Sequence, residues 1–525
     1  MDSVHVYDTT LRDGAQQEGL NLSVADKLAI AALVDELGVD FIEGGWPGAN
    51  PKDTEFFDRA RSELRLRHAT LTAFGATRRA GGSARDDVLV RALVDSGASV
   101  VCLVAKSHVR HVEEALRTTL EENLEMVRDT VSYLVAKGRR VFLDAEHFFD
   151  GWHLDRDYAL EVVRVAHEAG AEVVVLCDTN GGMLPHQVEQ VVSDVIAQTG
   201  ARVGVHCHND TGCAAANSVA AVRAGASHVQ GTVNGYGERT GNADLLTVAA
   251  NLQFKLGLEV LPEECFRQAT HLAHAISEVT NVPAHSRQPY VGASAFAHKA
   301  GLHASALKVD PHLYQHMDPS LVGNGMRTLV SDMAGRASIE LKAREAGLDL
   351  SARPDVVADV LAQVKELELR GWTFDAADAS IELMIRRVLS PGCVDFFQVE
   401  SWRVITDSSD DGAVSEATVK LVADGARHVA IGEGNGPVNA VDHALRQALC
   451  TAYPEIDKLE LIDYKVRILE ASHGTDAVTR VLIETSDGES SWTTIGVAGS
   501  ILAASWRALV DGVVYGLLRQ DVPIR

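Results

Sequence analysis

Cysteine is scarce and unpatterned in this chain, which excludes the protein classes that depend on it. The 525 residues include seven cysteines, and no two of them have the CxxC spacing of a zinc or redox motif. Scattered cysteines are typical of free thiols in a reducing compartment. We therefore expect no disulfide framework, and we expect a cytoplasmic protein.

Excess positive charge, long apolar runs and a leader-like N-terminus are also lacking. The formal net charge of −25 would repel a phosphate backbone, so nucleic acid is not an expected partner. No apolar run is long enough to span a bilayer, and no basic stretch followed by an apolar core opens the chain. We expect neither a membrane span nor a signal peptide. The length allows two to four soluble domains.

The first half of the chain repeats one pattern, a short apolar strand followed by an amphipathic helix. Eight strands alternating with helices within about 260 residues predict an α/β fold of the (β/α)8 TIM-barrel type. A doubly wound open sheet is the alternative. The predicted strands span residues 4–10, 41–45, 71–75, 100–105, 140–145, 173–178, 203–208 and 228–234.

Two histidines at the end of the seventh predicted strand are the strongest chemical signal. His206 and His208 are two residues apart, so their side chains leave the strand on the same face. Paired imidazoles at a strand end form half of a metal site. Cys207 lies between them and points to the other face, where we expect it to be buried. A polar strand end without metal is the alternative.

The other predicted strands also end in polar residues, and the barrel hypothesis explains why. Arg12 and Asp13 follow the first strand, Glu146 ends the fifth and Thr179 follows the sixth. In TIM barrels the chemistry lies at the C-terminal ends of the strands. A carboxylate such as Asp13 is a hard oxygen ligand, and an arginine such as Arg12 holds carboxylates or polarises carbonyls. We therefore expect one metal centre lined by several strands.

The remainder of the chain loses the strand-helix repeat. We predict a catalytic barrel over residues 1–265, a mainly helical linker region that completes the active site over 266–393, and an α+β regulatory domain over 394–525. A glycine-rich segment, residues 432–437, precedes a predicted helix at 438–448. It lacks the Lys-Ser/Thr of a P-loop, so we interpret it as a turn and not as a phosphate site.

Three long motifs give the chain a family resemblance. The segments LRDGAQ at 11–16 with Lys27, HCHNDTG at 206–212, and NGYGERTGN at 234–242 are ordered and spaced as in one enzyme family. The chain resembles the 2-isopropylmalate synthase, homocitrate synthase and citramalate synthase family. The resemblance covers essentially the whole length, including the C-terminal regulatory domain.

The resemblance implies a reaction and a metal site. Members condense acetyl-CoA with a 2-oxo acid in a Claisen-type step and then hydrolyse the thioester. Carried onto this chain, the divalent-metal ligands would be Asp13, His206, His208 and Asn242. The ligand set suits Mg²⁺, Mn²⁺ or Zn²⁺ and does not choose among them.

The same resemblance assigns the remaining site residues. Arg12 would offset the developing alkoxide charge, and Thr179 would hydrogen-bond the substrate carboxylate. Glu146 would remove a proton from the acetyl methyl group, with a structural ion pair as its alternative role. His303 and Tyr314 would assist thioester hydrolysis. Their alternatives are a surface or supporting histidine and a packing tyrosine.

The segment after the second strand points to one branch of the family. GGWPGANPKD at 44–53, with DAEHFFDG at 144–151, looks like the citramalate synthase branch. In that branch the acceptor is pyruvate and the product is (R)-citramalate, an entry to isoleucine through 2-oxobutyrate. The resemblance implies a homodimer with isoleucine as feedback effector. Trp46, Phe74 and Leu103 are candidates to fill a pocket around the acceptor methyl group.

Three alternatives stay open at this stage. A sister synthase for isopropylmalate or homocitrate would differ only in the 2-oxo acid pocket. A metal-dependent retro-aldol lyase of the same superfamily would share the first and second motifs but would not need residues 266–525. A non-catalytic amino-acid sensor would not need Arg12, Asp13 and Glu146 together.

Overall fold

The computed structural model describes residues 4–299, 301–409, 412–469 and 477–525. The chain forms two compact units. The first, here the barrel unit, comprises residues 1–296 and 319–325, and the second, here the C-terminal unit, comprises residues 297–318 and 326–525. The predicted division at 265/266 and 393/394 stays a prediction.

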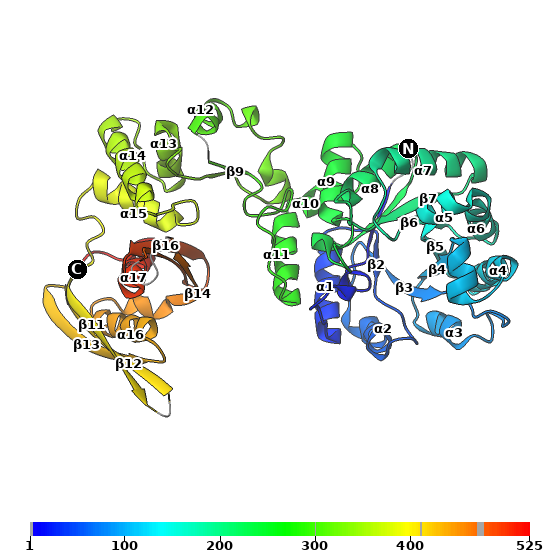
Figure 1. The fold of residues 1–525 in the computed structure, drawn as a ribbon, viewed down its shortest axis with the longest axis horizontal. Helices are drawn as coiled ribbons and strands as arrows, with labels where there is room; N and C mark the ends of the chain where they lie inside the picture. The colour runs from blue at the N-terminus through cyan, green and yellow to red at the C-terminus, as the bar shows by residue number, and fades with distance from the viewer. Residues whose placement is uncertain (1–3, 300, 410–411, 470–476) are drawn as a thin grey trace. The chain divides into compact units, whose positions relative to one another are not determined.

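Eight parallel strands close into a barrel in chain order, which confirms the TIM-barrel prediction over the open sheet. β1 pairs in parallel with both β2 and β8, and these two pairings close the ring. Helices surround the strands in the barrel unit (Figure 1). The strands are β1 (His5–Asp8), β2 (Phe41–Glu43), β3 (Thr70–Ala76), β4 (Val100–Lys106), β5 (Arg140–Glu146), β6 (Val173–Asp178), β7 (Val203–Cys207) and β8 (His228–Gly231).

The helices around the barrel begin at side-chain caps that the sequence provides. Ser23 and Asp26 form a reciprocal capping box, and Asp87, Thr119 and Asp155 each accept a hydrogen bond from a first-turn amide. Such caps satisfy amides that have no partner inside the helix. The helices are α1 (Val24–Glu36), α2 (Pro51–Glu63), α3 (Val88–Asp95), α4 (Leu120–Ala136), α5 (Phe148–Leu154), α6 (Arg156–Glu168), α7 (Pro185–Thr199), α8 (Ala214–Arg223), α9 (Leu245–Leu256), α10 (Glu263–Phe266) and α11 (Ala269–Thr280).

Alternate residues of the barrel strands fill its interior. Tyr7, Phe41 and Phe142 pack with aliphatic and cysteine side chains in one buried cluster. His228 is fully buried among these rings, 5.1 Å from Phe142 between ring centroids. The filled interior leaves the C-terminal strand ends as the place for chemistry.

The first part of the C-terminal unit is mainly helical, as predicted, with two short strands. Buried aliphatic residues of these helices form a core that also includes Ile495 and Val497. The helical region therefore shares a core with a strand near the end of the chain. Its elements are β9 (Ala297–His298), α12 (Gly301–Val309), β10 (Arg327–Thr328), α13 (Arg336–Glu345), α14 (Pro354–Leu369) and α15 (Asp378–Leu389).

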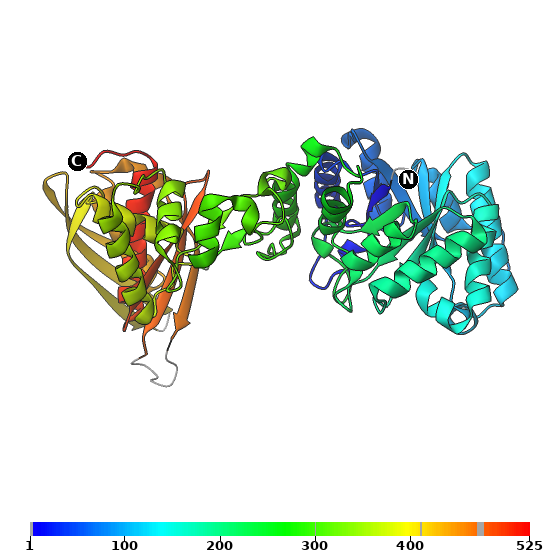
Figure 2. The ribbon, with the colours of Figure 1, turned by 90° about the horizontal axis from the view of Figure 1, so that it is seen from above.

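A strand-strand-strand-helix unit then occurs twice. The first consists of β11 (Phe397–Ser409), β12 (Gly412–Ala423), β13 (Ala426–Gly434) and α16 (Pro437–Leu449). The second consists of β14 (Glu460–Ile468), β15 (Thr479–Ser486), β16 (Ser491–Ala498) and α17 (Ile501–Arg519). Both helices and both sheets contribute to one buried core, and Figure 2 shows α17, in red, between the two groups of strands. This confirms the predicted α+β region. The sequence predicted strands at residues 396–406, 417–422, 459–469 and 477–484, which correspond to β11, β12, β14 and β15, but it did not predict β13 and β16.

The glycine-rich segment packs a helix against a sheet, so its interpretation as a turn was only partly right. Gly432 and Gly434 belong to β13, and only the residues after them turn into α16. A Cβ on Gly432 would lie 2.3 Å from the amide nitrogen of Ala444 in α16. Glycine is needed there because the helix backbone comes so close to the strand.

One helix corrects the expectation that no segment could span a membrane. By length and composition alone α17 passes that test, but 61% of the window is buried inside the protein. Its apolar residues belong to the core between the two sheets. A core helix enclosed on several sides is apolar all round, which explains the composition of α17.

The seven cysteines are free thiols.

Candidate active site

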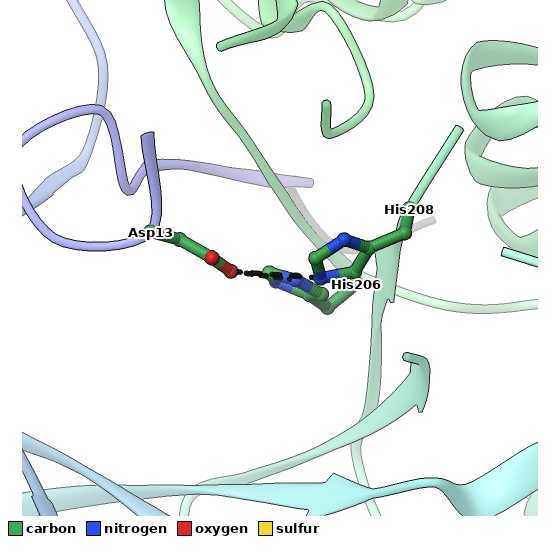
Figure 3. Close-up of side chains that lie close together, drawn as sticks. All are labelled: Asp13, His206 and His208. Atoms are coloured by element: carbon green, nitrogen blue, oxygen red, sulfur yellow. Dashed lines mark ion pairs between the residues drawn. The ribbon is translucent and has the colours of Figure 1, made fainter. Parts of the chain in front are cut away.

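Asp13, His206 and His208 meet at the C-terminal end of the barrel as a candidate metal centre (Figure 3). The Asp13 Oδ2 atom lies 3.1 Å from His206 Nε2 and 3.7 Å from His208 Nε2. All three side chains are buried. One carboxylate and two imidazoles that face a common point form a donor set suited to a divalent metal.

Local structure explains how these three side chains come together. His206 lies in β7 and His208 follows it, so strand alternation turns both rings the same way while Cys207 is buried on the other face. Asp13 follows β1 and precedes the short helix η1 (Gly14–Gln16), and its amide donates to the Thr9 carbonyl at 3.0 Å. The tight turn after β1 directs the carboxylate at the two rings.

A buried hydrogen-bond chain orients His206. Its Nδ1 lies 2.9 Å from Gln230 Oε1, and Gln230 Nε2 donates to Asp144 Oδ1 at 2.9 Å. Because the Gln230 oxygen only accepts, His206 Nδ1 carries a proton. Nε2 faces Asp13 Oδ2. Burial acts to lower the pKa of His206, but the hydrogen bond that Nε2 donates to this carboxylate outweighs burial and raises the pKa. A bound metal would take the place of the Nε2 proton. Hydrogen-bond partners such as Gln230 fix the tautomer and ring orientation of metal-binding histidines.

Asn242 lies beside the cluster with an unused oxygen. Its backbone forms a bridge with His208, and its Nδ2 donates to the Tyr236 carbonyl at 3.0 Å. Its Oδ1 is buried without a hydrogen-bond partner among the described residues. Gly237 makes room for the amide, because a Cβ there would lie 2.2 Å from Asn242 Nδ2 and the backbone has φ +148°. A buried oxygen without a partner is available to coordinate a cation.

The charges of the cluster fit cation binding. Burial disfavours the charged form of Asp13, but Arg12 and the hydrogen bond with His206 outweigh it and hold the pKa of this carboxyl below its usual range. Burial, followed by the neighbouring His206, lowers the pKa of His208 to about 4. A carboxylate and a neutral imidazole are the forms that bind metal.

Arg12 is fixed beside the cluster by Glu43. Its Nε donates to Glu43 Oε2 at 2.5 Å, and its Nη1 lies 3.4 Å from Asp13 Oδ2. The guanidinium carbon lies 3.9 Å from the centre of the Phe74 ring, and Glu43 also accepts from Tyr7 and Thr9. A partly buried arginine held on one side by a carboxylate directs its remaining N–H groups in a fixed geometry.

Glu146 and Thr179 line the same cavity as the metal cluster. The cavity has a volume of about 1000 Å³, and Arg12 is also among its lining residues. Glu146 forms an ion pair with Lys106. Thr179 Oγ1 accepts from the His147 amide at 2.9 Å, which leaves its hydroxyl hydrogen to donate elsewhere.

The loop after β2 is anchored by a buried ion pair. Lys27 Nζ lies 2.5 Å from Asp53 Oδ1, and Asp53 Oδ2 accepts from the Trp46 amide at 2.9 Å. Gly45 has φ +130°, and a Cβ there would lie 2.4 Å from the Asp53 carboxyl carbon. Trp46 packs edge-on against Phe74 at 5.6 Å, and both line the cavity.

Two predicted site residues belong to the other compact unit. His303, in α12, and Tyr314, after the short helix η4 (Pro311–Leu313), stack on each other with ring centroids 4.1 Å apart. Tyr314 is 46% exposed, so it does not pack into a core. The stack pairs the two residues that the sequence analysis grouped, and their roles stay predictions.

Comparisons with known proteins agree with this architecture. Residues 3–276 match the HMGL-like family model, residues 290–371 the homocitrate synthase post-HMGL domain-like model, and residues 375–517 the LeuA allosteric (dimerisation) domain. A curated (R)-citramalate synthase of Streptomyces coelicolor is 64% identical over 522 residues, covering 99% of this chain and 98% of the relative. The chain belongs to the (R)-citramalate synthase family.

More distant relatives extend the comparison. The (R)-citramalate synthase of Aquifex aeolicus is 46% identical over 524 residues and covers 99% of both chains. A probable 2-isopropylmalate synthase of Methanopyrus kandleri is 33% identical over 517 residues, covering 98% of both chains. Among solved structures, the HMG-CoA lyase of Bacillus subtilis covers 55% of this chain and 97% of its own, with 19% identity and a TM-score of 0.47.

The structure adds site residues of this family member that the sequence analysis did not assign. Glu43 holds Arg12, Gln230 orients His206, and Lys106 pairs with Glu146. Glu43 was visible as a polar strand end, but nothing in the sequence paired it with Arg12. Leu103 was named as a pocket candidate, but Cys102 and Val104 face the barrel interior, so strand alternation turns Leu103 outward.

Proposed function

We propose that this protein condenses acetyl-CoA with pyruvate and hydrolyses the thioester, releasing (R)-citramalate and CoA. The observation that carries the proposal is the full-length identity of 64% to a curated (R)-citramalate synthase. The buried Asp13, His206 and His208 cluster at the C-terminal end of the barrel gives this assignment its chemical basis.

The residues fit a divalent metal. Asp13, His206, His208 and Asn242 would hold it, because their facing atoms and the partnerless Asn242 oxygen supply nitrogen and oxygen donors. When bound, such an ion supplies Lewis acidity to the keto oxygen of the acceptor. Mg²⁺, Mn²⁺ and Zn²⁺ all accept this mixed donor set.

Arg12 and Thr179 bind and orient the 2-oxo acid. The N–H groups of Arg12 that Glu43 does not use face the site, where they stabilise negative charge that forms on the keto oxygen. The hydroxyl hydrogen of Thr179 donates to the acceptor carboxylate, since its oxygen already accepts from His147. Trp46 and Phe74 supply an apolar surface for the acceptor methyl group.

Glu146 is the base that removes a proton from the acetyl methyl group. It lies at the end of β5 and lines the cavity together with the metal cluster. His303 and Tyr314 act in thioester hydrolysis, where a stacked imidazole and phenol can orient water and transfer a proton. Substitution of His303 by Asn or Tyr314 by Phe should slow CoA release.

The C-terminal region makes the enzyme a feedback-regulated homodimer in the cytoplasm. The match to the LeuA allosteric (dimerisation) domain over residues 375–517 supports a dimer with an amino-acid effector. Isoleucine is the effector that the product predicts, because citramalate leads to isoleucine through 2-oxobutyrate.

The alternatives are less well supported. The isopropylmalate synthase relative is 33% identical, about half the value for the citramalate synthase. For a homocitrate synthase, the match to the homocitrate synthase post-HMGL domain-like model covers only residues 290–371 and not the barrel. The retro-aldol lyase would not need residues 266–525, which the synthase relatives share.

The test is free-thiol release from acetyl-CoA with pyruvate, followed by chiral analysis of the product. We expect (R)-citramalate and one thiol per product, loss of turnover with a chelator, and recovery with Mg²⁺ or Mn²⁺. Thiol release that does not depend on pyruvate, or that a chelator leaves unchanged, would contradict the proposal.

A further inference from the structure

The ion pair between Lys106 and Glu146 lies at the reaction cavity, where a purely structural salt bridge would not need to be. The two residues are register partners on the neighbouring strands β4 and β5, at the ends that face the cavity. Their side chains are 24% and 25% exposed, so substrate can reach both. A pair that faces a reaction cavity is placed to act on what binds there.

Hydrogen bonds from neighbouring side chains fix the backbones of Lys106 and Glu146 at the cavity. The Lys106 carbonyl accepts from Asn123 Nδ2 at 2.9 Å, and the buried Asn123 also donates to the Tyr158 hydroxyl at 2.8 Å. The Glu146 carbonyl accepts from Ser107 Oγ at 2.7 Å. Fixed backbones at both strand ends make the charged pair a preorganised feature.

Three other cations that line the cavity are bound to carboxylates with no assigned part in the proton transfer. Arg12 is held by Glu43, Lys27 by Asp53, and Arg239 by a two-point contact with Asp210. Lys106 differs from these, because its partner is the carboxylate proposed to act as base. Glu146 therefore loses its negative charge when it takes the proton, and Lys106 loses its anionic partner.

We propose that Lys106 is a catalytic residue whose ammonium group passes from Glu146 to the thioester oxygen of acetyl-CoA as the enolate forms. The inference rests on the proposed function and names a further residue for it. Glu146 takes a methyl proton, the C–H electron pair becomes the C=C bond, and the carbonyl π pair moves to the thioester oxygen. One negative charge thus moves from Glu146 to that oxygen, while Lys106 keeps its protons.

The next step completes the balance. The enolate carbon attacks the keto carbon of pyruvate, a C–C bond forms, the thioester carbonyl is restored, and the keto π pair moves to its own oxygen. The alkoxide on the former keto oxygen then takes the proton from Glu146 and becomes the hydroxyl group of the product. Glu146 is a carboxylate again, and Lys106 pairs with it as before.

The experiment compares Lys106→Met with Arg140→Met. Arg140 forms an ion pair with Glu172 at the opposite end of the same strand β5, at 2.7 Å, so it controls for loss of a salt bridge on that strand. We expect Lys106→Met to lower kcat by about 10²–10³, as removal of one oxyanion donor does, with the KM for pyruvate unchanged. Arg140→Met should keep wild-type turnover.

Deuterated acetyl-CoA separates catalysis from structure. In Lys106→Met the kinetic isotope effect with trideuteroacetyl-CoA should rise, because enolisation becomes rate-limiting. Lys106→Arg, which keeps a cation, should recover part of kcat, and ethylammonium should partly rescue Lys106→Ala but not Glu146→Gln.

Two different failures can be told apart. If the wild-type enzyme releases no CoA with pyruvate, the proposed function fails. If it does, and Lys106→Met matches Arg140→Met in kcat or loses activity without a change in isotope effect, the proposal for Lys106 is overturned. Lys106→Arg decides the case if Lys106→Met does not fold, since a fully inactive but folded Arg variant also contradicts it.

Discussion

At the scale of single residues, sequence spacing predicted where the two histidines lie, but other contacts of the site are visible only in the folded structure. The His-x-His spacing and the strand period placed His206 and His208 together, and the structure confirms that arrangement. Gln230 carried no such signal, because its contact with His206 joins residues on two strands that lie 24 positions apart. Sequence periodicity predicts the face of a side chain but not its partner across a barrel.

The orientation of His206 by Gln230 gives the first prediction. Gln230→Leu removes the acceptor for His206 Nδ1, so the ring loses its fixed tautomer, and metal affinity should fall about 10- to 100-fold. Isothermal titration with Mn²⁺ measures this directly on the full chain. The control is Gln190→Leu on the exposed face of α7. Equal affinities of the two variants would show that Gln230 has no part in the site.

At the scale of elements, the predicted and observed strands of the barrel agree closely, because buried parallel strands read as short apolar runs between amphipathic helices. In the C-terminal region the prediction was weaker. β13 and β16 contain Gly432, Gly434 and Gly496 where a helix backbone crosses them closely. Glycines that a strand needs for packing look like turn residues in the sequence.

The Lys27 and Asp53 pair links two elements and gives the second prediction. Lys27→Met leaves the buried Asp53 carboxylate without its cation, which should destabilise the fold by about 3–5 kcal/mol. Urea unfolding measures the loss. As a control, Lys308→Met breaks an exposed pair with Glu340 and should cost about 0–1 kcal/mol. A similar cost for both variants would contradict the anchoring role of the pair.

The buried His228 at the other end of the barrel gives the third prediction. Burial, then the nearby His5, Arg202 and Arg140, lowers the pKa of His228 well below its ordinary value of 6.5. Below pH 6.5 the unfolded chain binds a proton that the folded chain does not, so stability falls as the pH falls. His228→Gln should reduce the loss of unfolding free energy between pH 7 and pH 5. An unchanged pH dependence would mean that this histidine does not couple protonation to folding.

At the scale of the whole molecule, the resemblance predicted the barrel and the regulatory region, but the packing inside the C-terminal unit was not predictable. Ile495 and Val497 on β16 lie in one core with the helices that precede the repeated sheets. Removal of the chain from residue 394 onward would therefore expose apolar surface, because the core crosses that boundary. Residues so far apart in sequence give no local pattern that reveals their contact.

Feedback regulation gives the fourth prediction. Because a buried core crosses residue 394, the test uses the full chain and not a truncated one. Isoleucine should inhibit CoA release and raise the melting temperature, because an effector that binds the folded protein stabilises it by mass action. Leucine serves as the matched comparison. If leucine inhibits and isoleucine does not, the proposed effector is wrong while the allosteric domain assignment stands.

The fifth prediction concerns the acceptor and tests the account most directly. CoA release from acetyl-CoA is measured with pyruvate, 2-oxobutyrate, 2-oxoisovalerate and 2-oxoglutarate at matched concentrations. We predict the highest kcat/KM with pyruvate. We expect a modest advantage over 2-oxobutyrate, since one methylene is worth about 1–3 kcal/mol. A preference for 2-oxoisovalerate or 2-oxoglutarate would contradict the proposed function.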